Sequence, residues 1–123
     1  MNSGQAEHLR TGQRAEQLAE SLLVEAGLTI LERNFHSRFG ELDRVCRSER
    51  ELIFVEVRFR SHTGFGSAAA SVTLAKQKKL TKAAHYYILT HDHFSKFFMR
   101  FDVIGIDGKQ QAQWIKGAFL ATV

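Results

Sequence analysis

Residues 52–60, which read LIFVEVRFR, constrain the fold of this chain more than any other segment. β-Branched and aromatic residues dominate the segment, which is typical of a strand. Side chains alternate across a strand. One face is therefore wholly apolar, and we expect it to be buried: Ile53, Val55, Val57 and Phe59. The opposite face carries Leu52, Phe54, Glu56, Arg58 and Arg60. Glu56 thus points from the middle of the strand, between apolar neighbours and beside a fixed cation.

The remaining sequence predicts two helices and four further strands. Apolar residues recur at helical spacing in 5–26, directly before Gly27 as a C-terminal cap, and again in 73–89. Strands are expected at 28–35, 40–47, 97–106 and 111–115, and the polar turn 48–51 joins the second of these to 52–60 as a hairpin. Asp107-Gly108 is a hairpin signal between the last two strands. The order predicts an α/β fold with a mixed central sheet flanked by helices.

Length and composition favour one ordinary globular unit. A chain of 123 residues fits one domain, 1–123, and 44% hydrophobic residues suffice for a core. No repeat, low-complexity tract or linker interrupts the chain. The net charge of +4 favours an anionic partner such as nucleic acid, although many proteins are this basic without a functional reason.

The single cysteine and the N-terminal sequence bear on the compartment. Cys46 has no partner for an internal disulfide, and a lone cysteine in a strand is more often a buried small residue than a nucleophile. The N-terminal residues contain no apolar run of the signal-peptide kind, and no apolar stretch is long enough to span a bilayer. We therefore expect a cytoplasmic protein with no membrane partner.

Acidic residues on neighbouring segments form the main candidate site. Burying the carboxylate of Glu56 costs free energy unless it is paired or binds a metal ion. Asp43 shares a face of strand 40–47 with Glu41 and Val45, and in the right hairpin register it points to the same side as Glu56. Two such carboxylates suit Mg²⁺ or Mn²⁺, and Glu16, on the first helix, would add a third acidic group. The alternative is structural: Glu56 and Arg58 form a surface salt bridge, and Asp43 caps a turn.

Lysines at the start of the second helix form a positive cluster. Lys76, Lys78 and Lys79, followed by Lys82, would contact phosphates and make binding sensitive to salt. Arg58 and Arg60 would extend this cluster. The alternative is a solvated helix face, the usual explanation of such runs.

Other motifs favour structural roles. His91 and His93 flank Asp92, but no further ligand at zinc-site spacing accompanies them, which favours a polar loop. His62, near Gly64 and Gly66, could line the mouth of the site. Asp102 alternates with Arg100, which predicts a structural ion pair. A group of apolar residues is assigned to the core, with any exposed remainder indicating self-association: Phe94, Phe97, Phe98, Met99 and Phe101.

Motifs between residues 12 and 106 follow a specific order, namely GQRAEQLA, TILERNF, GELD, LIFVEVRFR, KQKKL and RFDVIGI. Each is weak alone, but together and at this spacing they resemble the bacterial YraN family. That family resembles a branch of the PD-(D/E)XK nuclease superfamily and is similar in layout to archaeal Holliday junction resolvases. The resemblance implies a restriction-endonuclease-like three-layer fold and metal-dependent cleavage of DNA.

The resemblance also implies roles for individual residues. Asp43 of GELD matches the metal-binding aspartate, Glu56 matches the acidic residue of the (D/E)-x-K element, and Glu16 matches the helix glutamate of resolvase-like members. Lys76 matches a basic position that faces phosphate. Arg58 stands where the superfamily has lysine. Because arginine stays protonated, it can stabilise negative charge but cannot act as a general base.

The leading hypothesis is a Mg²⁺-dependent nuclease acting on DNA, branched or otherwise structured, with Asp43, Glu56, Glu16 and Arg58 at the catalytic site. The rival is a nuclease-fold protein that has lost turnover through Arg58 and binds nucleic acid without cleaving it. A third hypothesis is a protein-binding adaptor with no affinity for DNA. The choice of DNA over RNA rests on the resemblance alone, and a homodimer would suit a symmetric DNA junction.

Overall fold

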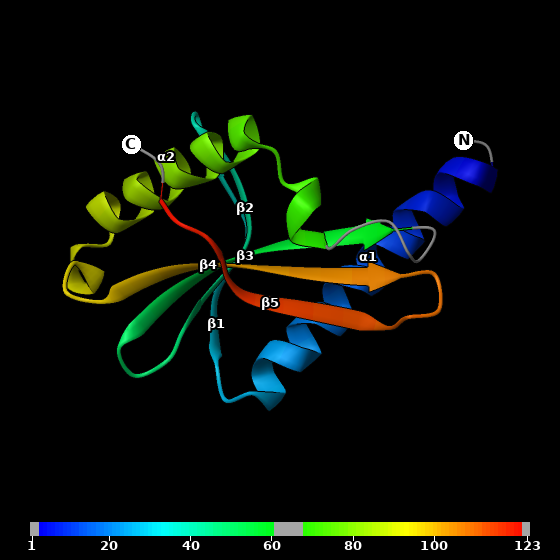
Figure 1. Ribbon diagram of the computed structural model, residues 1–123, viewed down its shortest axis with the longest axis horizontal. Helices are drawn as coiled ribbons and strands as arrows, with labels where there is room; N and C mark the ends of the chain where they lie inside the picture. Colours follow the sequence, from blue (N-terminus) through cyan, green and yellow to red (C-terminus); the bar gives the residue numbers. More distant parts are fainter. Residues whose placement is uncertain (1–2, 61–67, 122–123) are drawn as a thin grey trace.

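A central sheet with one long helix on each face organises the computed structural model (Figure 1). The structure describes residues 3–60 and 68–121, with side chains from residue 12 onward. The helices are α1 (Ser3–Glu25) and α2 (Leu74–Thr90). The strands are β1 (Thr29–Ser37), β2 (Gly40–Arg47), β3 (Glu51–Arg60), β4 (Phe98–Asp107) and β5 (Ala112–Phe119). Two short 3₁₀ turns, η1 (Ala68–Ser71) and η2 (Asp92–Phe94), precede and follow α2.

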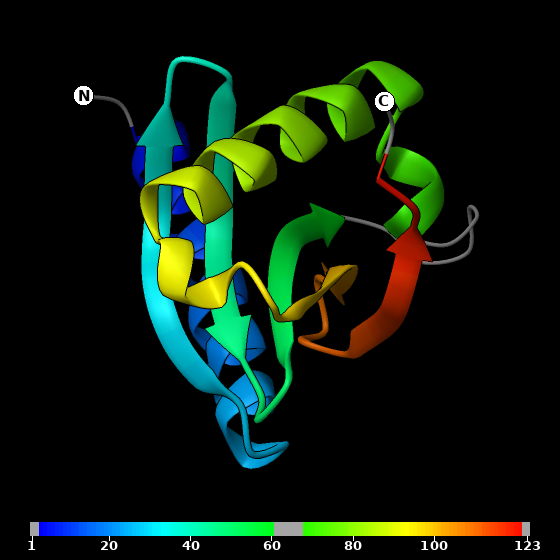
Figure 2. The same ribbon diagram turned by 90° about the vertical axis from the view of Figure 1, so that its left-hand side faces the viewer.

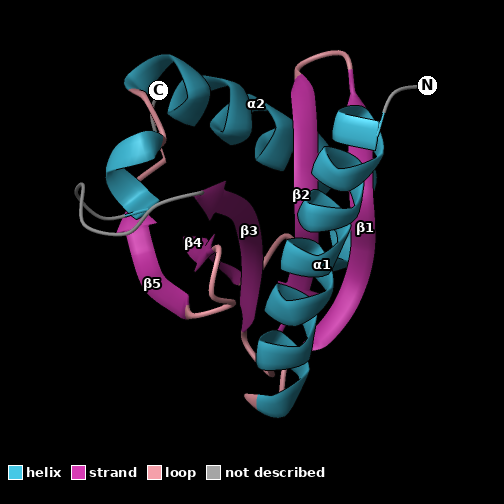
Figure 3. Cartoon of the chain, turned by 90° about the vertical axis from the view of Figure 1, so that its right-hand side faces the viewer, coloured by secondary structure: helices cyan, strands magenta, loops and turns pink. Residues whose placement is uncertain are grey.

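The sheet is mixed, as the sequence predicts. Its strand order is β1-β2-β3-β4-β5, and β3 pairs with β4 in parallel while the other neighbouring pairs are antiparallel. The parallel pair requires a long crossover connection, which contains η1 and α2. Figures 2 and 3, taken from opposite sides, show α2 crossing one face and α1 crossing the other. This arrangement agrees with the expected restriction-endonuclease-like fold.

Each face of the sheet has its own core. Under α1, the small residues Ala15 and Ala19 pack with Leu23 against Ile53 and Val55 of β3. Under α2, the other face of the same strand contributes Leu52 and Phe54 to a second cluster, together with Leu80, Ala83, Ala84 and Tyr87 of the helix. β3 is therefore covered on both faces, which explains its nearly continuous apolar sequence.

The sequence predicts the C-terminal cap of α1 and the start of α2, and the structure confirms both. Gly27 adopts a φ of 90° just after α1, and its amide donates to the Val24 carbonyl at 3.0 Å. The Thr73 hydroxyl caps α2 by accepting a hydrogen bond from the Lys76 amide at 3.2 Å. Within the described part of the chain, neither helix is long and apolar enough to cross a membrane.

Three expectations need correction. Phe59 was expected in the buried face of its strand but is 37% exposed near the C-terminal end of β3. The last strand is longer than predicted and continues to Phe119. Strict alternation fails in β2, where Leu42 and Val45 pack in the same cluster although they are three positions apart.

Irregularities mark both outer strands. In β1 the register with β2 shifts between Ile30 and Glu32, and Asn34 has a φ of 52°. In β5 the register shifts opposite the segment from Phe101 to Val103, and Gly117 has a φ of 60°. The buried carboxylate of Asp102 accepts the Gly117 amide at 2.9 Å, which fixes this second irregularity.

Gly105 lets η1 lie directly on the sheet. It pairs with Arg58 across the parallel strands, and a Cβ at this position would overlap the Cβ of Ala68. A larger residue would therefore displace η1 from its place against β4.

We predict that Gly105→Ala lowers the free energy of unfolding by about 1–3 kcal/mol, because the new methyl group overpacks the contact with Ala68. Urea unfolding measures the change, and Ala68→Gly added to Gly105→Ala should recover most of it. Gly12→Ala is the control: no atom lies near its Cβ position, so it should stabilise α1 by roughly 0.5–1 kcal/mol. Equal effects of the two alanines would contradict this explanation.

Candidate active site

The candidate site lies where β2 and β3 separate. Their antiparallel ladder runs from Arg47–Leu52 to Arg44–Val55, so the next pair in register would be Asp43 and Glu56. That pair does not form, and Figure 2 shows β3 curving away from β2 toward its C-terminal end. The pairing of the two strands therefore ends at the positions of the two acidic residues.

Two hydrogen bonds outside the ladder hold Asp43. Its carboxylate accepts the Val57 amide at 2.9 Å, and its backbone carbonyl accepts Arg44 Nη1 at 2.7 Å. Burial raises the pKa of Asp43 most strongly, the Val57 amide opposes this rise, and repulsion from Glu41 adds to it. The carboxylate is thus fixed in position but remains costly to ionise.

Glu56 is the least satisfied charged group of the site. Its side chain is 8% exposed, and its Oε2 atom has no hydrogen-bond partner within the described residues. Burial, followed by repulsion from Asp43, raises its pKa from 4.5 to about 7. Asp43 is the second-largest cause of the shift, so its carboxylate lies within electrostatic range of Glu56.

Two cations approach the other oxygen of Glu56. Lys76 Nζ of α2 lies 3.8 Å from Oε1, and Arg58 Nε of β3 lies 4.0 Å from it. Both distances exceed hydrogen-bond length. Arg58 Nε is itself buried and lacks a hydrogen-bond partner among the described groups. Glu56 and Arg58 therefore form the predicted ion pair, but their charged atoms are too far apart for a hydrogen bond. Lys76 contacts the same oxygen of Glu56.

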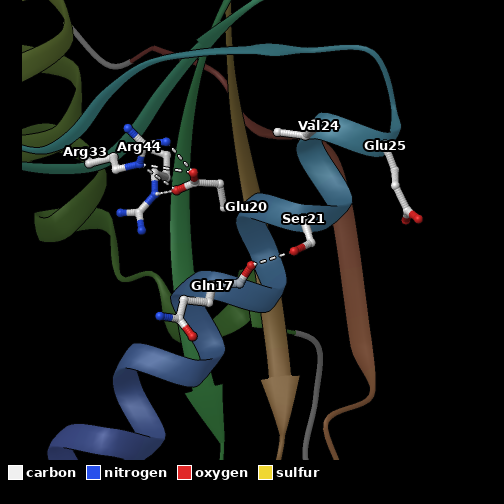
Figure 4. Close-up of a pocket in the computed structure, with 7 residues that line it drawn as sticks. All are labelled: Gln17, Glu20, Ser21, Val24, Glu25, Arg33 and Arg44. Atoms are coloured by element: carbon white, nitrogen blue, oxygen red, sulfur yellow. Dashed lines mark hydrogen bonds and ion pairs between the residues drawn. The ribbon is translucent and has the colours of Figure 1, made fainter.

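Glu16 lies beside the site but faces a different partner. Its Oε2 atom is 3.9 Å from Nη2 of Arg44, and burial is the largest cause of its raised pKa, with Asp43 and Glu41 adding repulsion. Arg44 also donates from Nε to Glu20 at 2.8 Å, and Glu20 is bound in turn by exposed Arg33 (Figure 4). Glu16 thus lies within electrostatic range of Asp43, and Arg44 contacts Glu16 while it donates a hydrogen bond to Glu20.

Arg44 and Glu41 are site residues that the sequence reasoning missed. Arg44 is 5% exposed and secures the backbone of Asp43, a role that depends on contacts with α1 rather than on a local motif. Glu41 is exposed at the rim, yet its charge raises the pKa of Glu16, Asp43 and Glu56. The sequence signal that could have identified Glu41 was its position two residues before Asp43.

The predicted basic residues divide into two groups. Lys76 reaches the acidic pair, whereas Lys78 and Lys79 are exposed on the first turns of α2. Lys79 lies over the turn between β1 and β2, because a Cβ on Gly40 would be 3.6 Å from the Lys79 Cβ. Arg60 is half-buried at the end of β3. His62, predicted at the mouth of the site, falls outside the described residues.

The motifs assigned to structural roles mostly fulfil them. His91 stacks on Tyr87 with ring centroids 3.9 Å apart, and His93 packs on Phe94. Cys46 is fully buried, and burial raises the pKa of its thiol to about 12. In the phenylalanine-rich group, Phe94 and Phe101 are buried, whereas Phe98 is 71% exposed.

Asp102 provides an internal comparison for Glu56. It is fully buried and accepts four hydrogen bonds: Arg100 Nε at 2.8 Å, Arg100 Nη2 at 2.9 Å, Trp114 Nε1 at 2.9 Å and the Gly117 amide at 2.9 Å. This confirms the predicted structural ion pair. The same sheet can therefore satisfy a buried carboxylate completely, which it does not do for Glu56.

The acidic pair has the donor chemistry of a magnesium site. Across residues 12–60 and 68–121, no three His, Cys, Asp or Glu side chains gather closely enough to hold a metal ion alone. Mg²⁺ is commonly bound by one or two carboxylates with water and substrate phosphate completing its shell. Asp43 and Glu56 fit this pattern, since both are hard oxygen donors and Oε2 of Glu56 lacks a partner.

Comparisons with known proteins identify relatives along nearly the whole chain. A family model described as "Uncharacterised protein family UPF0102" matches residues 15–106. A "UPF0102 protein" of Saccharophagus degradans is 47% identical over 114 residues, which cover 93% of this chain and 96% of that protein. Another, from Alkalilimnicola ehrlichii, is 44% identical over 119 residues, or 97% and 94%. "UPF0102 protein lpg2994" of Legionella pneumophila is 46% identical over 109 residues, or 88% and 92%.

The raised pKa of Glu56 predicts a pH-dependent loss of stability in the absence of divalent cations. The folded protein favours the protonated carboxyl, so the free energy of unfolding falls as pH rises from 4.5 to about 7 and this loss is complete above that range. We predict that Glu56→Gln is more stable than wild type by about 1–3 kcal/mol near pH 8, and that the difference disappears near pH 4. Urea unfolding in EDTA measures both.

Glu49→Gln serves as the matched control. Glu49 is an exposed carboxylate in the turn between β2 and β3, so its neutralisation should change stability little at either pH. A constant difference between wild type and Glu56→Gln across this pH range would show that burial does not shift the titration of Glu56.

Proposed function

Since this chain belongs to the uncharacterised protein family UPF0102, the YraN family that its motifs resemble, and carries an acidic pair beside two cations, we propose that it is a metal-dependent nuclease acting on DNA. One observation carries the proposal: Glu56 is a buried carboxylate with an unpartnered oxygen and a raised pKa. Unsatisfied buried charges with strongly shifted pKa values cluster at functional sites.

A purely structural role explains Glu56 poorly. A structural ion pair would satisfy the carboxylate with short hydrogen bonds, as Arg100 and Trp114 do for Asp102. Lys76 and Arg58 instead remain 3.8 and 4.0 Å from a single oxygen of Glu56. The arrangement is costly for the folded protein, and a bound divalent cation would remove much of that cost.

In the proposed reaction, Asp43 and Glu56 would hold Mg²⁺ or Mn²⁺. The cation would activate water and neutralise charge on a phosphodiester. Arg58 stabilises negative charge that develops on the phosphate, and Lys76 holds a phosphate oxygen from the side of α2. Glu16 would add a third acidic group or orient a water, and it also contacts Arg44.

The substrate would approach over the start of α2. Lys78 and Lys79 are exposed there and continue the positive surface from Lys76. The resemblance to junction resolvases favours branched or structured DNA as the substrate, and no base-reading motif points to a preferred sequence.

Arg58 favours a second candidate function. Because arginine cannot accept a proton, a reaction that needs a basic amine on this strand would not proceed. The rival is then a nuclease-fold protein that binds nucleic acid, or a protein partner, without cleavage.

We predict that the protein cleaves four-way-junction, flap or linear DNA in Mg²⁺ or Mn²⁺, and that Asp43→Asn and Glu56→Gln each reduce cleavage at least about a hundredfold. Both substitutions keep the side-chain shape while removing the charge. Denaturing gels measure cleavage, and matched RNA substrates test the choice of DNA.

Lys96→Gln is the control for loss of a surface charge, because Lys96 is exposed between η2 and β4 and should leave cleavage unchanged. Cleavage that appears only in Arg58→Lys would favour the lapsed nuclease. An absence of DNA binding even at low salt would leave the protein-binding adaptor.

The lysines of α2 allow an independent binding test. We predict that Lys78→Gln and Lys79→Gln each weaken DNA binding similarly for all sequences and reduce the logarithmic salt slope by about 1. Fluorescence anisotropy at several salt concentrations measures both effects, again with Lys96→Gln for comparison. Unchanged slopes would assign these lysines to a solvated helix face.

A further inference from the structure

The charges around Glu56 nearly balance without any ligand. When Asp43 and Glu56 are both ionised, their two negative charges face the positive charges of Lys76 and Arg58, and Glu41 adds a negative charge at the rim. A phosphate group that approaches these charged side chains would meet no net attraction, because Lys76 and Arg58 are already paired with Glu56. The basic residues of the site are therefore occupied before any substrate arrives.

Neither cation is held firmly in this role. Their contacts with Oε1 exceed hydrogen-bond length, and the side chains of Lys76 and Arg58 are 35% and 32% exposed. Each cation therefore has access to solvent on one side and a loose ion pair on the other. A modest change in the charge at the two carboxylates would therefore release each cation from its ion pair with Glu56.

A divalent cation at Asp43 and Glu56 would make this change. It would add two positive charges where Lys76 and Arg58 now supply them, and like charges at such short range repel strongly in a partly buried site. This repulsion would favour conformations in which the ammonium and guanidinium groups turn outward, toward the nearest available anion.

We propose that Lys76 and Arg58 exchange partners, balancing Glu56 in the metal-free protein and turning to a phosphate of the nucleic acid when a divalent cation takes their place. This inference rests on the proposed function and assigns a regulation to the same site. The protein keeps these cations away from DNA until metal is present, so binding of metal and binding of DNA each strengthen the other.

The exchange has a thermodynamic signature. If Mg²⁺ increases the affinity for DNA by some factor, DNA must increase the affinity for Mg²⁺ by the same factor. Lys76 and Arg58 carry this coupling, so their loss should reduce it. Loss of Lys76 should also strengthen Mg²⁺ binding in the absence of DNA, because the cation no longer competes for Glu56.

The experiment measures binding rather than cleavage. Anisotropy of a short labelled DNA duplex, with strand integrity checked on gels, gives DNA affinity with and without Mg²⁺, and calorimetry gives Mg²⁺ affinity with and without DNA. For wild type we expect Mg²⁺ to strengthen DNA binding about tenfold. Lys76→Gln and Arg58→Gln should each reduce this factor severalfold, while Lys96→Gln should retain it. Circular dichroism verifies that each variant folds.

The outcomes separate this inference from the proposed function. Coupling of equal size in wild type, Lys76→Gln and Arg58→Gln overturns the exchange, even if cleavage is intact. Mg²⁺ binding with no effect on DNA affinity also overturns it. An absence of Mg²⁺ binding by calorimetry overturns both proposals together. A protein that shows the coupling but never cleaves DNA supports the exchange and contradicts the nuclease.

Discussion

The hydrogen bond from the Val57 amide to the Asp43 carboxylate is the interaction on which the site depends. It forms where the ladder between β2 and β3 has ended, so a side chain takes over the donor that a backbone carbonyl would otherwise accept. The Asp43 carboxylate is consequently held against β3, and Arg44 donates a hydrogen bond to the backbone carbonyl of Asp43. Both acids therefore lie at the point where the pairing of β2 and β3 ends.

The crossover from β3 to β4 determines which cations reach these acids. Parallel pairing of the two strands requires the intervening chain to pass over one face of the sheet, and α2 is part of that passage. The start of α2 therefore lies near the C-terminal half of β3, which brings Lys76 to Glu56. Gly105, which pairs with Arg58, contributes by allowing η1 to rest directly on β4.

Local patterns predicted much of this molecule. The alternation in LIFVEVRFR placed Glu56 mid-strand on the face opposite Ile53, and helical spacing identified both helices with their caps. Features that depend on contacts between distant segments could not be predicted from the sequence. Arg44 became a site residue only through its contacts with Glu16 and Glu20 of α1, and the interruption at Asp43 follows from strands that separate in space. Phe59 was misassigned because alternation defines the face on which a residue lies but not how deeply that residue is buried.

The interrupted outer strands have a consequence for self-association. A sheet grows by strand addition when its edge offers an unbroken row of amide and carbonyl groups. β1 is broken by its register shift and by Asn34, and β5 by the irregularity at Gly117. Both edges therefore resist intermolecular β-pairing, which protects the protein from aggregation by that route.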